Sequence, residues 1–210
     1  MIEIIYIDDS IVVCIKPKGV LSAKDASGKT NMTELLAQQV GVSEVFPIHR
    51  LDREVGGIMV FALNREAAAK LSSEVASCTE FQKEYTALIS GDPQNESGIF
   101  EDLLFKDSSK NKTFVVKKER KGTKKAKLAY TVLRRFDGKT LVGVRLFTGR
   151  THQIRVQFSS RGMPIVGDRK YGGLPCSNGI ALCSTALAFT HPVSGEKLKF
   201  TRDFDVEAFI

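Results

Sequence analysis

Short apolar segments rich in β-branched residues recur along the chain, and polar turn residues separate them. Residues 2–7 and 11–15 flank Asp8-Asp9-Ser10, which predicts a β-hairpin. Residues 113–116 and 126–135 are predicted to form a second, long hairpin, and Asp137-Gly138 predicts a tight turn into a strand at 140–147. The remaining predicted strands cover residues 46–50, 57–63, 83–90, 180–190 and 197–201.

Capping residues and apolar spacing predict three helices. Asn31, with Glu34 three residues later, is typical of a helix start and predicts a helix to about residue 39. Asn64 precedes an alanine-rich helix at 65–77, and a short helix is predicted at 151–161. Many strands, short turns and few helices predict an α+β fold, a mainly antiparallel mixed sheet with flanking helices. No linker or repeat interrupts the chain, so we expect a single domain over residues 1-210.

The composition is that of a globular protein. Hydrophobic residues make up 42% and charged residues 26% of the 210 residues, which is not typical of disorder. No apolar run approaches the roughly 18–20 residues of a membrane span, and no basic segment precedes an apolar one at the N-terminus. Four scattered cysteines (Cys14, Cys78, Cys176 and Cys183) predict reduced thiols, and we therefore expect a cytoplasmic protein without membrane contact.

The positive charge is concentrated in one segment. Residues 110–127 contain nine Lys or Arg residues and one acidic residue, so the segment carries a local charge of +8, whereas the whole chain carries +7. Such a segment binds nucleic-acid phosphates by releasing counterions. It is equally consistent with a solvated hairpin tip that keeps a loop soluble.

Common cofactor motifs are missing. Gly28-Lys29-Thr30 resembles the end of a phosphate loop, but Ala23 stands where that loop needs glycine. The chain has no Gly-x-Gly dinucleotide fingerprint, no His-Glu-x-x-His and no Gly-x-Ser-x-Gly. We therefore expect no cofactor and no metal.

One loop combines a carboxylate with two arginines. In His49-Arg50-Leu51-Asp52-Arg53, the carboxylate of Asp52 lies between guanidinium groups, which favour its ionised form. An ionised carboxylate serves as a nucleophile or as a base. The alternative is an ordinary surface ion pair in a loop.

Two further clusters could bind anions and bases. Thr148-Gly149-Arg150-Thr151 leads from a strand into a helix, and Arg155 follows, which suits an anion such as an RNA phosphate. The alternative is a capped helix with arginines facing solvent. Lys83-Glu84-Tyr85-Thr86-Ala87 places Tyr85 on a strand, where its ring could stack on a nucleobase or pack in the core.

Together these motifs resemble those of the RluA-type family of RNA pseudouridine synthases. The resemblance begins at Lys16-Pro17-Lys18-Gly19-Val20-Leu21 and extends to the closing strands. Gly162-Met163-Pro164-Ile165-Val166-Gly167-Asp168 and Tyr171-Gly172 follow the arginine cluster in the family's order. The resemblance implies the pseudouridine synthase catalytic fold. Because the first predicted hairpin begins at residue 2, we expect no N-terminal accessory RNA-binding domain of the kind that many relatives carry. It also implies an isomerase that converts uridine to pseudouridine in tRNA or rRNA.

The resemblance also implies roles for residues. Asp52 attacks the ribose or removes a sugar proton, Tyr85 stacks on the uracil, and Arg150 pairs with Asp52 and holds it ionised. Arg50 helps to hold the nucleotide out of its helix. The other expected substrate-binding residues are His49, Arg53, Ile154 and Arg155. The expected RNA-backbone contacts are Lys117, Lys118, Lys121, Lys124 and Lys125. The reaction exchanges no electrons, so the implied protein needs RNA but no cofactor or metal, and we expect a monomer.

The chain departs from the family at several positions. Val55-Gly56 stands where Thr-Ser is usual, Gln157 replaces a frequent histidine, and Cys183-Ser184 replaces His-Ala. These departures leave Asp52 and the two other catalytic candidates in place. A non-catalytic RNA-binding module of the same fold is one alternative, and loss of the aspartate would mark it. A hydrolase is another, but it needs a second acid or base, and no paired carboxylate motif supplies one.

Overall fold

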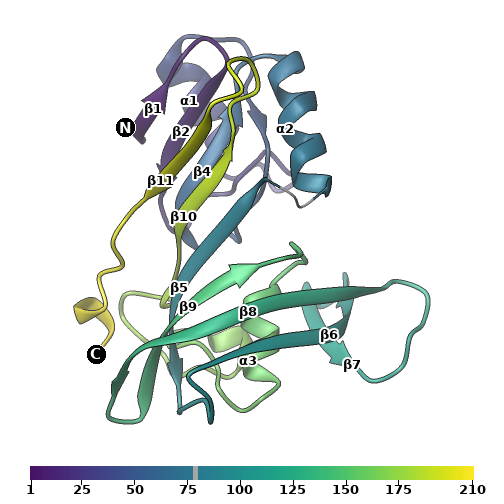
Figure 1. Ribbon diagram of the computed structural model, residues 1–210, viewed down its shortest axis with the longest axis vertical. Coiled ribbons are helices and arrows are strands. Elements are labelled where there is room, and N and C mark those ends of the chain that lie inside the picture. Colours follow the sequence, from purple (N-terminus) through teal and green to yellow (C-terminus); the bar gives the residue numbers. More distant parts are fainter. Residues whose placement is uncertain (78–79) are drawn as a thin grey trace. The chain divides into compact units, whose positions relative to one another are not determined.

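The computed structural model describes residues 1–77 and 80–210 (Figure 1). The chain forms two compact units. The first unit contains Met1–Lys83 and Ser184–Asp203, and the second contains Glu84–Cys183 and Phe204–Ile210. The first two of the three boundaries fall inside strands, β5 (Gln82–Ser90) and β10 (Leu182–Thr190), and the third lies between Asp203 and Phe204 near the C-terminus. Because a strand carries the chain across the first two boundaries, no linker marks these units in the sequence.

Paired strands form the centre of the first unit. They are β1 (Glu3–Ile7), β2 (Ile11–Lys16), β4 (Gly56–Ala62), β10 and β11 (Lys197–Thr201), in the order β1-β2-β4-β10, with β11 paired to β10. The pairs β1–β2, β2–β4 and β10–β11 are antiparallel. The predicted first hairpin is confirmed, and Asp8 Oδ1 accepts hydrogen bonds from the amides of Ser10 and Ile11 in its turn. The strand predicted at 46–50 is shorter. It forms β3 (Phe46–Pro47), which pairs with β4, and the chain then leaves the sheet as a loop.

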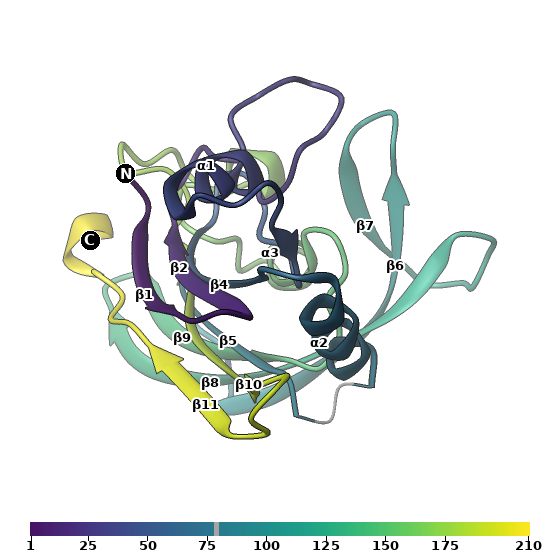
Figure 2. The same ribbon diagram turned by 90° about the horizontal axis from the view of Figure 1, so that it is seen from above.

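Two helices lie beside these strands (Figure 2), α1 (Met32–Val40) and α2 (Arg65–Ser77). The predicted cap of α1 is confirmed, since Asn31 Oδ1 accepts from the Glu34 amide at 3.0 Å and Asn31 Nδ2 donates to Glu34 Oε2 at 2.8 Å. Every residue of β4 is buried. The core around it joins strands and α2 through Ile11, Val13, Ile58, Val60, Leu71, Leu187 and Phe189.

The second unit contains the other strands of the sheet. Its strands are β5, β6 (Ser97–Asp107), β7 (Lys112–Val116), β8 (Thr123–Phe136) and β9 (Lys139–Leu146), in the order β5-β9-β8-β6-β7. The predicted hairpin between 113–116 and 126–135 is wrong, because β6 lies between β7 and β8 and pairs with both. The sequence pattern missed β6, since Phe100 and Leu104 are its only buried residues and Glu101-Asp102 interrupts its apolar positions.

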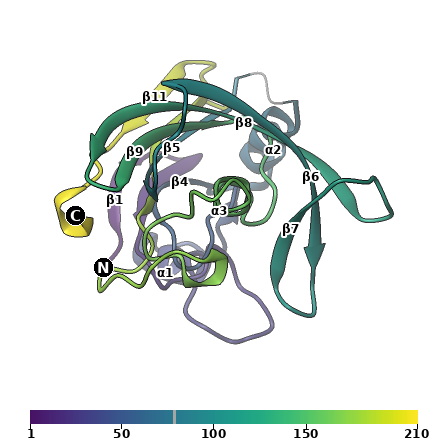
Figure 3. The ribbon, with the colours of Figure 1, turned by 90° about the horizontal axis from the view of Figure 1, so that it is seen from below.

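The helix α3 (Gln153–Ser159) covers one face of the curved strands β9, β8 and β6 (Figure 3). Phe158 packs against Phe100 and Tyr130, with ring centroids 5.1 and 5.9 Å apart. The helix is shorter than the predicted 151–161, because His152 adopts a left-handed conformation with φ 53°. Two short 3-10 helices, η1 (Arg169–Tyr171) and η2 (Glu207–Phe209), complete this unit. Within the described residues, no helix is long and apolar enough to span a membrane.

Gly57 marks a place where two backbones approach closely. Its φ is +125°, and a Cβ atom there would lie 2.5 Å from Ser184 N. We expect Gly57→Ala to lower the free energy of unfolding by at least ~3 kcal/mol, because neither backbone can move without breaking strand pairing. Urea unfolding measures this. Gly143→Ala is the control, since its Cβ would meet only Leu133 at 3.6 Å, and a change below ~1 kcal/mol is expected. Equal effects of the two changes would contradict the steric explanation.

Candidate active site

Asp52 lies half-buried in the loop between β3 and β4, and the backbone on both sides of it is anchored. Before it, Ser22 Oγ donates to the Leu51 carbonyl at 2.8 Å and accepts from the Leu51 amide at 3.0 Å. After it, the Gly19 amide donates to the Arg53 carbonyl at 2.8 Å. These bonds tie the Asp52 loop to residues 19–22, so the carboxylate projects from a fixed backbone.

A buried lysine also bonds to the backbone of the Asp52 loop. The Lys16 side chain is fully buried, and its Nζ donates to the carbonyls of Pro17 at 2.9 Å and Arg53 at 3.1 Å. Burial lowers the pKa of Lys16 to about 8, although the negative charges of Glu54 and Asp52 act in the opposite direction. At neutral pH the ammonium therefore keeps its proton and places a positive charge close to the candidate catalytic carboxylate.

The other polar residues of this motif differ in exposure. His49 is buried, accepts a hydrogen bond from the Val60 amide at Nε2, and meets the Phe81 ring edge-on at 5.7 Å. Burial lowers the pKa of His49 to about 3, so the ring is neutral and offers no charge to a phosphate. We therefore place His49 among the residues that position the loop. Arg50 and Arg53 are exposed.

The loop that carries Arg150 is fixed by one buried glutamine. Gln153 Oε1 accepts from Thr148 Oγ1 at 2.8 Å and from the Arg150 amide at 3.0 Å, and its Nε2 donates to the Lys127 carbonyl at 3.1 Å. Arg150 itself is exposed, and its Nε donates to the Lys125 carbonyl at 3.0 Å. The arginine loop is thus fastened to β8, as the Asp52 loop is fastened to residues 16–22.

The three remaining candidates of the second unit are buried. Arg155 forms two hydrogen bonds of 2.7 Å with Asp168, and its guanidinium lies 5.1 Å from the Tyr171 ring centroid. Such a bidentate pair fixes both side chains, so Arg155 stabilises the fold around the arginine loop. Ile154 is 4% exposed on α3, and Tyr85 is 6% exposed on β5.

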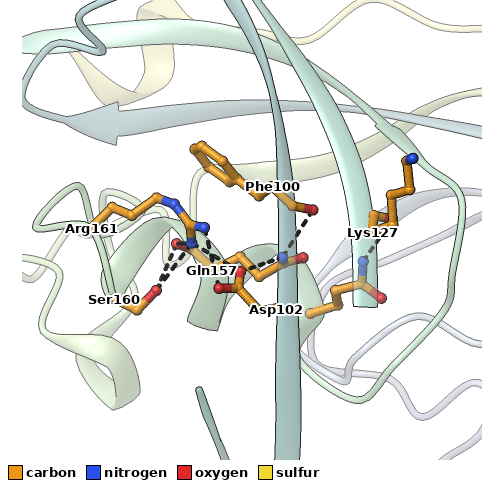
Figure 4. Close-up of polar contacts among 7 residues, drawn as sticks. Phe100, Asp102, Lys127, Gln157, Ser160 and Arg161 are labelled. Atoms are coloured by element: carbon orange, nitrogen blue, oxygen red, sulfur yellow. Dashed lines mark hydrogen bonds and ion pairs between the residues drawn. The ribbon is translucent and has the colours of Figure 1, made fainter. Parts of the chain in front are cut away.

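A polar network that the sequence did not reveal locks α3 to β6 (Figure 4). Gln157 Nε2 donates to Asp102 Oδ2 at 2.6 Å and to the Phe100 carbonyl at 3.3 Å. Arg161 forms an ion pair with Asp102 at 3.0 Å, and its guanidinium lies 3.9 Å from the Phe100 ring centroid. Because α3 directly follows the arginine loop, this network also holds that loop in place. Only recognition of β6 as a strand could have indicated it.

The basic segment, residues 110–127, contains β7, a connecting loop with an internal anchor, and the start of β8. Residues 117–122 connect β7 to β8, and the guanidinium of Arg120 lies 4.1 Å from the Phe105 ring centroid. Thr123 Oγ1 also donates to the Arg120 carbonyl at 2.7 Å. The five predicted RNA-backbone residues are all exposed: Lys117, Lys118, Lys121, Lys124 and Lys125. Arg120 thus shapes the loop, while these lysines face solvent.

The candidate residues fall into both units. The first unit contains His49, Arg50, Asp52 and Arg53, and the second contains Tyr85, Arg150, Ile154, Arg155 and the five lysines. Among the described residues, no group of three or more His, Cys, Asp or Glu side chains is arranged to hold a metal ion.

Comparisons with known proteins agree on one family. A family model described as RNA pseudouridylate synthase matches residues 10–160. A protein of Aquifex aeolicus, named an uncharacterized RNA pseudouridine synthase, is 34% identical over 95% of this chain and 68% of its own length. Ribosomal large subunit pseudouridine synthase C of Haemophilus influenzae is 30% identical over 97% of this chain and 65% of its own length. The structure of human RNA pseudouridylate synthase domain containing 4 shares the fold, with a TM-score of 0.80 at 20% identity over 99% of this chain and 92% of that one.

The buried ammonium of Lys16 predicts a pH-dependent difference in stability. The folded protein holds this proton less tightly than the unfolded chain, because the pKa falls from 10.5 to about 8 on folding. Unfolding of the wild type should therefore become harder relative to Lys16→Met as the pH rises from 8 to 10, by up to ~1.4 kcal/mol per pH unit. Urea unfolding at pH 7.5, 9 and 10 measures this, and Lys29→Met controls for the loss of an exposed lysine. A pH-independent difference would show that Lys16 is not desolvated.

Proposed function

The chain belongs to the RluA-type family of RNA pseudouridine synthases, and from this premise we propose that it modifies uridine in ribosomal RNA with Asp52 as the catalytic carboxylate. The family makes it an isomerase that acts on RNA. Ribosomal RNA is favoured as the target because three similar bacterial proteins are named ribosomal large subunit pseudouridine synthase C, and transfer RNA is the second candidate. The enzyme acts on this RNA as a monomer in the cytoplasm.

The reaction rearranges one nucleotide without a net gain or loss of atoms. The N1–C1′ bond of uridine breaks, the uracil turns, and C5 bonds to C1′, while C5 gives up its proton and N1 gains one. Asp52 acts either as the nucleophile at C1′, leaving when C5 attacks, or as the base that removes a sugar proton. Both routes require an ionised carboxylate held at a fixed position.

The observation that carries this proposal is the anchoring of the Asp52 loop. Ser22 fixes the residue before Asp52, and Lys16 and Gly19 both bond to the carbonyl of the residue after it. A surface ion pair in a mobile loop needs no such support. The Lys16 ammonium, buried beside the loop, also bonds to the Arg53 carbonyl directly after Asp52.

The remaining candidates divide into substrate contacts and supports. Tyr85 stacks on the uracil, Arg150 balances the negative charge of the catalytic carboxylate, and Arg50 holds the flipped nucleotide. Ile154 adds an apolar wall, and Arg53 is a further substrate contact. His49 and Arg155 are buried and act by positioning the loops next to them.

The exposed lysines of the basic segment hold the RNA backbone. The contact between Arg120 and Phe105 anchors the loop of Lys117, Lys118 and Lys121, while Lys124 and Lys125 follow on β8. Together these ammonium groups neutralise phosphates without selecting a sequence. This role is separate from the chemistry, because no catalytic candidate lies in the segment.

The first test concerns Asp52. Asp52→Asn retains the size of the side chain but removes its charge, so pseudouridine formation should fall to background while RNA binding persists. Pseudouridine mapping on ribosomal and transfer RNA from cells that lack the protein identifies the target, and single-turnover assays give the rate. Glu54→Gln, a neighbouring exposed carboxylate, is the matched control and should retain activity. A near-normal rate for Asp52→Asn would remove Asp52 from the mechanism.

The second test concerns the basic segment. Changing Lys117, Lys118, Lys121, Lys124 and Lys125 to Gln should weaken RNA binding and flatten its salt dependence, by roughly 0.7–0.9 in log–log slope for each phosphate that the protein no longer neutralises. The modified position should remain the same, because these lysines do not select sequence. The control changes three exposed lysines of the first unit, Lys70, Lys197 and Lys199. If affinity and slope match the wild type, the segment is a solubility loop.

A further inference from the structure

Helix α3 covers the inner side of the curved strands in the second unit (Figure 3). On the outer side, the 3-10 helix η2 contacts the end of the β8–β9 hairpin, where Arg134 pairs with Glu207 at 3.9 Å and Lys139 Nζ donates to the Phe209 carbonyl at 3.0 Å. The middle of the outer side, toward the other end of β8, carries exposed side chains. Strand register places Glu101 opposite Lys127, and Ile99 opposite Ala129. We call this outer side the open face, and its central residues are Ile99, Glu101, Lys125, Lys127, Arg145 and Phe147.

The centre of the open face is an exposed phenylalanine between two cations. Phe147 directly follows β9 and is 37% exposed, and its amide donates to the Lys127 carbonyl at 3.1 Å. Lys127 Nζ lies 5.7 Å and the Arg145 guanidinium carbon 5.5 Å from the ring centroid. These distances are near the outer limit of a cation–aromatic contact, so the ring keeps surface available for a further group.

The aromatic character continues along the sheet. Phe105 of β6 lies opposite Phe114 of β7, and the neighbouring pair on the same side of the sheet is Leu103 and Val116. Phe114 is 36% exposed. Positive charges accompany these rings, since Arg120 lies over Phe105 and Lys112 Nζ is 5.8 Å from the Phe114 centroid. The open face therefore alternates rings with cations across several strands.

This combination favours a nucleic acid over a protein partner. Protein interfaces are depleted in lysine, whereas single-stranded RNA binds where bases stack on aromatic rings and basic groups follow the phosphates. One acidic residue opposes the trend, because Glu101 pairs with Lys127 at 2.7 Å and removes part of its charge.

We propose that the open face binds a single-stranded segment of the RNA substrate, with one nucleobase stacked on Phe147 and phosphates held by Lys125, Lys127 and Arg145. Four-stranded sheets with exposed aromatic residues bind RNA in this way elsewhere. The proposal rests on the proposed function only in that RNA is the substrate. It does not involve Asp52, which lies in the first unit.

The probe is single-stranded octaadenylate, which contains no uridine and cannot be isomerised. The full chain should bind it, and Phe147→Ala should weaken binding about 5- to 100-fold because one base no longer has a ring to stack on. Phe147→Trp should keep the affinity, whereas Phe147→Leu should behave like Ala because it is apolar without a ring. Leu133→Ala, an exposed apolar residue on β8, is the matched control and should not change binding. Equal affinity of the wild type and the Ala and Leu variants would overturn the proposal.

Charge variants test the phosphate contacts independently. Arg145→Gln should lower the salt slope by roughly 0.7, and Glu101→Gln should strengthen binding about 2- to 5-fold by releasing Lys127. If the Glu101–Lys127 pair instead stabilises the RNA-binding surface, Glu101→Gln should weaken binding. Asp52→Asn should bind octaadenylate like the wild type, so failure of the proposed catalytic role leaves this test unaffected. If sedimentation shows a dimer that Phe147→Ala dissociates, and octaadenylate does not bind, the face joins two copies and the proposal is overturned.

Discussion

Lys16 places an ammonium group beneath the Asp52 loop, where solvent does not reach it. Taking this charge out of water costs several kcal/mol, and the carbonyls of Pro17 and Arg53 offset the cost only while they point at Nζ. A different loop conformation would leave the buried ammonium without these partners. The cost of burying the Lys16 ammonium without partners therefore destabilises other conformations of the loop. It restricts the loop more than hydrogen bonds exposed to water could. The result is a carboxylate that needs no reorganisation when substrate arrives.

The second unit fixes its arginine loop with neutral amides and a buried ion pair in place of a single buried cation. Gln153 connects three backbone and side-chain groups around Arg150, and Gln157 connects α3 to β6. Arg155 and Asp168 satisfy one another through two short bonds. The position of the exposed Arg150 therefore depends on contacts among residues of α3, β6 and β8. Substitution of Asp102 or Asp168 is therefore expected to displace the loop that carries Arg150.

Local chemistry made part of this structure predictable. The first hairpin follows from its Asp-Asp-Ser turn, and α1 follows from the cap formed by Asn31 and Glu34. The Asp52, Tyr85 and Arg150 motifs were visible because they are short and contiguous. The strand β6 was not predictable from its pattern, since it buries only two side chains and lies between β7 and β8 through long-range pairing. The burial of Lys16 and His49 was equally hidden, because a polar residue in a sequence is expected at the surface.

The net charge of residues 110–127 does not show which of their cations are available to bind RNA. In the sequence, residues 110–127 form one segment with a net charge of +8, but in the structure its cationic side chains have different partners. Lys127 pairs with Glu101, Lys112 lies over the Tyr171 ring at 5.1 Å, and Arg120 lies over Phe105. The lysines without such roles, from Lys117 to Lys125, are exposed on the connecting loop and the start of β8. An antiparallel sheet covered on one face normally presents polar side chains on the other. Phe147 and Phe114 depart from that rule on the face where the cations gather, which is why the open face, and not the charge alone, indicates a surface for single-stranded RNA.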